Sequence, residues 1–123
     1  MLQSKMGTFT GTASDAFNSI VNFGNSVDGF NGQRVSIQNL FYTITGESGS
    51  GAATKVVSLI AKSAGVDVTL QANSVDAEAT VNNSFTSEVA MCRGPQSVSN
   101  IGFKILAKSG DTPVTVKYLI NYE

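Results

Sequence analysis

Apolar and polar residues alternate along most of this chain of 123 residues, and a period of two is the pattern of strands that bury one face. Glycine, asparagine, aspartate and serine gather between the alternating runs, where they favour turns. The pattern predicts about eight strands, at residues 5–12, 17–23, 34–45, 55–63, 66–73, 79–92, 101–109 and 113–122. We therefore expect an all-β fold, a single antiparallel β-sandwich that is jelly-roll-like. Residues 15–123 would form this domain, and residues 1–14 would form an N-terminal arm or an edge strand.

A partial internal repeat supports a fold in two similar halves. The sequence Ile60-Ala61-Lys62-Ser63, then four residues, then Val68-Thr69-Leu70, returns 46 positions later as Leu106-Ala107-Lys108-Ser109, four residues, Val114-Thr115-Val116. Each copy predicts a hairpin, one over residues 55–73 and one over residues 101–122. In the returning strands the alternation predicts a core face made of Val66, Val68, Leu70, Ala72, Val114, Val116, Tyr118 and Ile120.

The strand expected at residues 34–45 changes the parity of its apolar positions. These lie on one face at Val35 and Ile37, and on the other at Leu40, Tyr42 and Ile44. One extra residue near Gln38 and Asn39 would return them all to a single face, so we predict a β-bulge or a bend there.

Two segments near the amino terminus admit more than one interpretation. Residues 15–23 fit a helix capped by Ser14, because Phe17, Ile20 and Val21 have helical spacing, but they also fit a strand, which we favour. In residues 1–14, Met6, Thr8 and Thr10 alternate with Phe9 on the opposite side. This alternation is compatible with an edge strand or with a flexible extension.

Charge is scarce, since only 14% of residues are charged and the formal net charge is −1. The 15 Ser, 11 Thr, 10 Asn and 5 Gln supply polarity instead, and such groups cost less to bury than ions do. This balance gives no field that would attract nucleic acid or an anionic membrane, so neither is an expected partner. The first residues show no signal peptide pattern, which makes synthesis in a cytoplasm the simplest expectation.

The sequence offers little catalytic equipment, and we expect no enzyme activity, no cofactor and no metal. It contains no histidine, which excludes a Ser-His-Asp or Cys-His mechanism. Cys92 is the one cysteine, so it forms no internal disulfide and is expected to pack as a small apolar residue. Asp76 and Glu78 are the closest pair of acids and could in principle cleave a glycosidic bond or bind calcium. We expect them to be solvated loop charges.

Two loops are candidates for binding sites. Glu47-Ser48-Gly49-Ser50-Gly51 is rich in glycine, but no Lys-Ser or Lys-Thr follows it, so we expect a connecting loop and no phosphate site. Residues 24–33 hold Phe30 between Asp28 and Asn31, a loose match to a glycan-binding loop with an exposed aromatic ring. The alternative is that Phe30 packs beneath its own loop.

The paired segments at 55–73 and 101–122, the loops rich in Ser, Thr, Asn and Gly, and the arm at 1–14 resemble the small β-sandwich proteins of virus particles. These are the decoration or cement proteins of tailed-phage (bacteriophage) heads and jelly-roll capsid or spike subunits. The resemblance implies a structural virion protein, a homo-oligomer with a trimer favoured, seated on a capsid or other protein lattice. Contacts between subunits would then involve residues 1–14, including Met6 and Phe9, and the loops at 24–33 and 46–54. The alternative function is a carbohydrate-binding module or receptor-binding tip.

Overall fold

The computed structural model describes residues 2–11, 17–22, 35–46, 54–63, 66–87, 89–91, 98–107 and 113–123. These residues form nine strands: β1 (Gln3–Gly11), β2 (Phe17–Asn22), β3 (Val35–Thr45), β4 (Lys55–Ser63), β5 (Val66–Val75), β6 (Thr80–Phe85), β7 (Val89–Met91), β8 (Val98–Ala107) and β9 (Val114–Tyr122). No helix that could cross a membrane occurs in this part of the chain.

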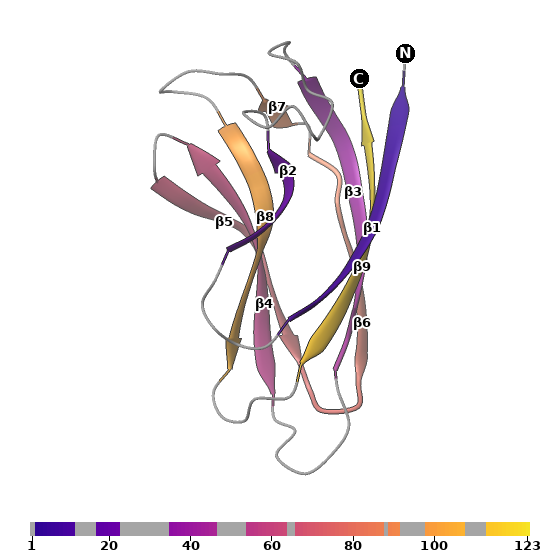
Figure 1. Cartoon of the computed structure of the whole chain (residues 1–123), viewed down its shortest axis with the longest axis vertical. Coiled ribbons are helices and arrows are strands. Elements are labelled where there is room, and N and C mark those ends of the chain that lie inside the picture. Colours follow the sequence, from indigo (N-terminus) through magenta and orange to yellow (C-terminus); the bar gives the residue numbers. More distant parts are fainter. Residues whose placement is uncertain are drawn as a thin grey trace.

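The strands form two sheets that face each other (Figure 1). One sheet contains β1, β9, β3 and β6 in that order, and the other contains β2, β8, β4 and β5. The short strand β7 extends the first sheet beside β3 and touches β8 through one parallel bridge, from Met91 to Val98. The order of the strands is that of a jelly roll, which confirms the predicted antiparallel β-sandwich.

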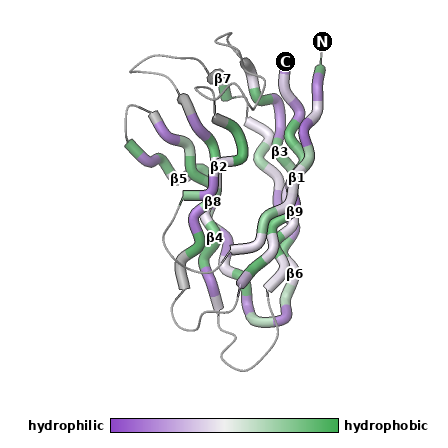
Figure 2. Tube along the Cα trace, viewed as in Figure 1, coloured by the Kyte–Doolittle hydropathy of each residue, from purple (hydrophilic) through white to green (hydrophobic). Residues whose placement is uncertain are grey.

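The hydrophobic core fills the space between the two sheets. At its centre the ring of Phe103 meets the ring of Phe9 at a centroid distance of 5.8 Å and the edge of Tyr42 at 5.1 Å. Figure 2 shows hydrophobic and hydrophilic residues interspersed along the strands of both sheets. The residues buried in the core are Ile20, Val21, Ile37, Leu40, Tyr42, Ile44, Val57, Leu59, Ala61, Val75, Ile101, Phe103, Ile105, Val114, Val116 and Ile120.

A β-bulge in β3 keeps its two apolar runs on the same side, as predicted. Between Ile37, which pairs with Tyr122, and Asn39, which pairs with Asn121, the residue Gln38 has no counterpart on β9. Ile37 and Leu40 are consequently both 2% exposed although they are three positions apart.

The segment at 15–23 is a strand in its described part and carries a second bulge. Ser19 pairs with Gly102 and Val21 with Ile101, so Ile20 is the extra residue. Ile20 and Val21 are therefore neighbours in sequence that are both buried. The strand interpretation is confirmed, and the helix is excluded for residues 17–22.

The predicted core face of β5 is wrong over most of the strand. Val66 is 61% exposed and Val68 is 49% exposed, and Ala72 is exposed as well. Val68 pairs with buried Ala61 and so lies on the inner side, but this end of β5 lies at the open edge of its sheet (Figure 1). Alternation identifies a side of the strand, whereas burial also needs an opposite sheet that covers it.

A third bulge explains the other half of β5. Leu59 pairs with Gln71 and Ile60 pairs with Thr69, which makes Leu70 the extra residue. After Leu70 the side chains at odd-numbered positions point inward instead of those at even-numbered positions, and Asn73 and Val75 are therefore buried. Leu70 itself still packs against the core.

The second predicted hairpin does not exist. β8 lies between β2 and β4, whereas β9 lies between β1 and β3 in the other sheet. The repeat instead places its two first strands side by side, because β4 and β8 pair antiparallel with Ser58 opposite Lys104, which are equivalent positions of the repeat. On β9, Val114, Val116 and Ile120 are buried as predicted, whereas Tyr118 is only partly buried. Alternation sets the buried face of a strand without choosing its neighbour.

Two further expectations concern strand limits. The segment at 79–92 forms two strands, β6 and β7, and the interruption faces the bulge in β3 at Gln38, where the register of β3 shifts. Of the two alternatives for the amino-terminal segment, residues 3–11 form an edge strand, fully paired with β9.

Gly102 tests the close packing of β2 on β8. A Cβ atom at this position would lie 2.2 Å from the backbone oxygen of Asn18 and 2.7 Å from Cζ of Phe17. We expect Gly102→Ala to lower the free energy of unfolding by about 1–3 kcal/mol, measured by urea denaturation, because backbone must move to relieve the overlap. Gly11→Ala is the control, since its nearest obstacle is the mobile Cδ1 of Ile105 at 3.1 Å. Equal losses in both variants would contradict this packing.

Candidate assembly surface

The outer face of the β1-β9-β3-β6 sheet, called the outer face below, carries side chains in regular rows. The strand registers bring outward residues of neighbouring strands directly opposite one another. The rows are Ser4, Asn121 and Asn39; then Met6, Leu119, Phe41 and Ser84; then Thr8, Lys117, Thr43 and Asn82; then Thr10, Thr115, Thr45 and Thr80.

One of these rows has three apolar residues, and two of them are open to solvent. Met6 on β1 is 77% exposed and Phe41 on β3 is 44% exposed, and Leu119 on β9 lies between them in the same row. Lys117 is the one charged residue among the outward positions that the structure describes on these four strands. The outer face is thus a nearly uncharged sheet surface crossed by an exposed apolar row.

Side chains within the polar rows form hydrogen bonds with one another. Ser4 Oγ donates to Asn121 Oδ1 at 2.6 Å, and Asn121 Nδ2 donates to Asn39 Oδ1 at 2.5 Å. Thr43 Oγ1 donates to Asn82 Oδ1 at 2.8 Å. Because these groups already have protein partners, removal of water from the outer face leaves fewer of them unsatisfied.

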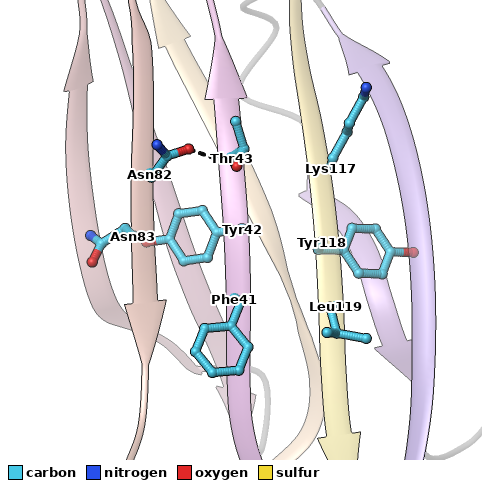
Figure 3. A pocket seen from close by; sticks show the side chains of 8 residues that line it. All are labelled: Phe41, Tyr42, Thr43, Asn82, Asn83, Lys117, Tyr118 and Leu119. Carbon is cyan, nitrogen blue, oxygen red and sulfur yellow. Dashed lines mark hydrogen bonds between the residues drawn. The ribbon is translucent and has the colours of Figure 1, made fainter.

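A shallow depression of about 380 Å³ lies on the outer face between β6, β3 and β9 (Figure 3). Phe41 and Leu119 supply apolar surface, and the polar groups of Asn82, Thr43 and Lys117 lie above them in the view of Figure 3. An aromatic ring beside amide, hydroxyl and ammonium groups can contact an apolar side chain or the face of a sugar.

A hydrogen-bond network lies behind the depression and joins the two sheets. The hydroxyl of Tyr42 donates to Gln71 Oε1 at 2.6 Å and accepts from Asn73 Nδ2 at 2.8 Å. Asn83 Nδ2 donates to Asn73 Oδ1 at 2.7 Å, and Gln71 Nε2 donates to the backbone oxygen of Ser84 at 2.7 Å. Burial raises the pKa of Tyr42 above its ordinary value of 10.0, and the hydrogen bond with Asn73 partly offsets this rise. The network fixes β6 and β3 against β5.

The outer surface of the other sheet differs in charge. Asp67 Oδ2 lies 2.8 Å from Lys104 Nζ, and Asp67 Oδ1 lies 3.5 Å from Lys62 Nζ. The hydrogen bond from Lys104 is the main reason that the pKa of Asp67 is below its ordinary value. Lys62 Nζ also lies 4.5 Å above the ring of Phe17. Lys62, Asp67 and Lys104 thus form a charged cluster on this outer surface.

Of the residues predicted to make assembly contacts, the structure separates Met6 from Phe9. Met6 belongs to the exposed row, whereas the side chain of Phe9 turns inward against Phe103. The glycan candidates Phe30, Asp28 and Asn31 lie outside the described residues, as do Cys92 and the loop residues 24–33 and 47–53.

The acidic pair lies in the turn between β5 and β6. Asp76 is exposed, and its Oδ1 accepts a hydrogen bond from Thr54 Oγ1 at 2.9 Å. Glu78 is exposed and has a φ of 64°, the left-handed conformation that closes the turn. Within the described residues, no three His, Cys, Asp or Glu side chains lie close enough together to hold a metal ion.

Phe41 and Leu119 are the surface residues that sequence reasoning missed. Both stand at the solvent parity of their strands, among Asn39, Thr43 and Lys117. An apolar residue in an otherwise polar outward series is the signal that could have identified them.

Comparisons with known proteins place the fold but no family. No protein-family model matches the sequence, and no curated protein is similar to it. Among solved structures, a protein of the Bacillus endospore appendages, described as disulfide-linked pili, has a TM-score of 0.57 at 12% identity, with 98% of this chain and 87% of that chain covered. A chain of the Nora virus structure has a TM-score of 0.52 at 12% identity, and the likeness covers 98% of this chain but 56% of that chain. The Drosophila NLP core, described in relation to pentamer formation and histone binding, has a TM-score of 0.51 at 13% identity, with 95% of each chain covered. At these identities the likeness is one of fold.

The network behind the depression predicts a large effect of one hydroxyl. Tyr42→Phe would remove the hydroxyl that donates to Gln71 Oε1 and accepts from Asn73 Nδ2, so both groups would lose a hydrogen bond. We expect the free energy of unfolding, measured by urea denaturation, to fall by about 1–3 kcal/mol. Tyr122→Phe removes a hydroxyl whose bond to Gln3 is exposed, and it should cost at most about 0.5 kcal/mol. A loss from Tyr42→Phe no greater than that from Tyr122→Phe would show that the network contributes nothing.

The raised pKa of Tyr42 predicts a loss of stability at alkaline pH. The network binds the neutral phenol, so the contribution of Tyr42 is complete below the unfolded pKa of 10.0 and is lost as pH rises through the higher folded pKa. The difference in unfolding free energy between the wild type and Tyr42→Phe should therefore be constant below pH 10.0 and shrink above it. A difference that stays constant above that pH would contradict the assignment.

Proposed function

We propose that this protein is a structural subunit that assembles with copies of itself into the lattice of a virion or a comparable particle. Its role there would be that of a capsid decoration or cement protein or of a capsid subunit, with a trimer as the favoured oligomer. The observation that carries the proposal is the apolar row on the nearly uncharged outer face, in which Met6 and Phe41 are exposed and Leu119 lies between them.

The physical argument rests on what a second subunit would have to displace. Burial of apolar surface contributes roughly 25 cal/mol per Å², and one charged side chain, Lys117, would have to be accommodated on this face. The outward threonines and asparagines are already hydrogen-bonded to one another in part, so little polar desolvation opposes contact. A modest contact of this kind becomes effective when a lattice repeats it many times.

The structural comparisons support this proposal at the level of fold. A chain of a pilus and a chain of a virus have the same kind of sandwich over 98% of this chain, and the Drosophila NLP core is described as forming a pentamer. These examples indicate that the fold suits repeated subunit contacts. They support a homo-oligomer without fixing its number.

We further propose that the protein is not an enzyme. Its sequence has no histidine, and the two side chains of the acidic pair, Asp76 and Glu78, are both exposed in the turn between β5 and β6. A virion location and the absence of nucleic-acid and membrane partners belong to the same proposal.

A carbohydrate-binding role is the second candidate, and the depression of Figure 3 favours it. Phe41 offers a half-exposed ring, and Asn82, Thr43 and Lys117 offer hydrogen bonds beside it. Calorimetric titration with a panel of glycans tests this role. Saturable binding that Phe41→Ala abolishes would support it, whereas no binding to the wild type would exclude it.

The assembly proposal predicts that polar substitutions in the exposed row weaken self-association. We expect Met6→Ser and Phe41→Ser each to raise the dissociation constant by roughly tenfold or more, measured by sedimentation velocity over a concentration series. Val68→Ser is the matched control, because Val68 is exposed to a similar extent as Phe41 but lies on β5, away from this face. A wild type that stays monomeric at every concentration would refute the proposal, and an equal effect of Val68→Ser would refute the role of the row.

A further inference from the structure

We propose that two copies of the chain pair through the free edges of their β1 strands, antiparallel about a twofold axis at Gly7, and so join two sheets into one. This inference rests on the proposed self-assembly and specifies one of its contacts. A twofold contact is compatible with a trimer, because a lattice of trimers can be joined through twofold contacts.

The edge formed by β1 is regular along its whole length. β1 pairs with β9 over all nine of its residues with no shift of register, and within the described residues it pairs with no other strand. The remaining edge strands are less regular or shorter. β2 and β5 contain bulges at Ile20 and Leu70, and β6 has six residues. β1 is therefore the longest unbroken edge of the described fold.

The backbone and side chains of β1 also suit pairing with another strand. An edge strand presents backbone N–H and C=O groups on its free side, and an extended strand is the structure that matches their spacing. Proteins commonly block such edges with proline, a bulge or outward charges, and β1 has none of these. Its one charged residue, Lys5, turns toward β2, where Nζ donates to the backbone oxygen of Ile20 at 2.9 Å. The edge is thus uncharged and open to pairing.

A second copy of β1 matches this edge residue by residue. If Gly7 lies opposite Gly7 of the second copy, all nine residues find a partner, and outward residues stay on the outward side of both copies. Lys5 then faces Phe9 of the other copy, so the two ammonium groups do not meet. Met6 faces Thr8, and the two exposed Met6 side chains become diagonal neighbours.

This arrangement continues the apolar row from one subunit into the next. Each copy contributes Phe41, Leu119 and Met6 in that order toward the axis. Gly7 has no side chain that would fill the space at the axis. The side chain of Tyr118 occupies the space beside Gly7, since a Cβ atom on Gly7 would lie 2.2 Å from the hydroxyl oxygen of Tyr118. Figure 3 shows the side chain of Tyr118 extending from β9 toward β1. The hydroxyl is therefore close to the edge at which the second copy would add its strand.

Disulfide formation between chains tests both the edge and the register. In a Cys92→Ser background, chains carrying Met6→Cys are mixed with chains carrying Thr8→Cys and oxidised. Opposite residues of an antiparallel pair have Cα distances that suit a disulfide, so we expect this mixture to cross-link about tenfold faster than a control mixture of Met6→Cys with Thr10→Cys. Circular dichroism verifies that each variant keeps the β-sheet spectrum of the wild type.

The outcomes separate the two proposals. Particles that assemble by light scattering but cross-link equally fast in both mixtures, or not at all, would overturn β1 pairing and leave the proposed function standing. A wild type that shows neither particles nor dimers would overturn both.

A charge variant provides a second test that needs no oxidation. Met6→Lys combined with Thr8→Lys would place like charges opposite each other and should abolish the pairing. Met6→Lys combined with Thr8→Glu would place opposite charges together and should restore it. Equal association of the two double variants would contradict the register.

Discussion

The packing of one apolar face of each sheet against the other is the interaction on which the rest of this structure depends. A strand presents alternate residues to opposite sides, so a single unmatched residue would turn the remainder of its side chains away from the core. The chain meets this constraint with bulges at Ile20, Gln38 and Leu70, each of which resets the inward parity. The outward series that results on β1, β9 and β3 is what places Met6, Leu119 and Phe41 in one row.

The alternation of the sequence predicts the buried faces better than it predicts the neighbours of each strand. The bulge at Gln38, the inward face of β9 and the strand at 17–22 all follow from positions that can be counted along the chain. The partner of β9 does not follow, because its alternation would be the same beside β8 or beside β3. The repeat is an accurate sign of related strands, but it relates β4 and β8 as neighbours instead of defining two hairpins.

The candidate surface could be predicted only in part, for a related reason. Met6 can be recognised in the sequence as a residue of the amino-terminal strand. Phe41 and Leu119 lie 35 and 113 positions further along the chain. They become neighbours of Met6 only because β1, β9 and β3 pair in one particular register. Val68 shows the opposite failure. It has the alternation of a core residue, yet it lies where no opposite strand covers it, and coverage depends on the position of a whole sheet.

The two sheets also divide the chemistry of the molecule between them. The sheet of β2, β8, β4 and β5 carries the Lys62, Asp67 and Lys104 cluster on its outer surface, where hydrated charges favour contact with water. The other sheet carries the apolar row, and among the described strands its end strand β1 pairs with β9 alone. We infer that contact with other subunits is directed to one side of the sandwich.

Hydrogen exchange measured by mass spectrometry at high and low protein concentration tests this central claim most directly. The account predicts that backbone amides of residues 3–11 exchange more slowly in the concentrated sample, while those of the other edge at residues 66–75 exchange at the same rate in both. Slower exchange on β5 in place of β1, or rates that do not depend on concentration in either strand, would contradict it.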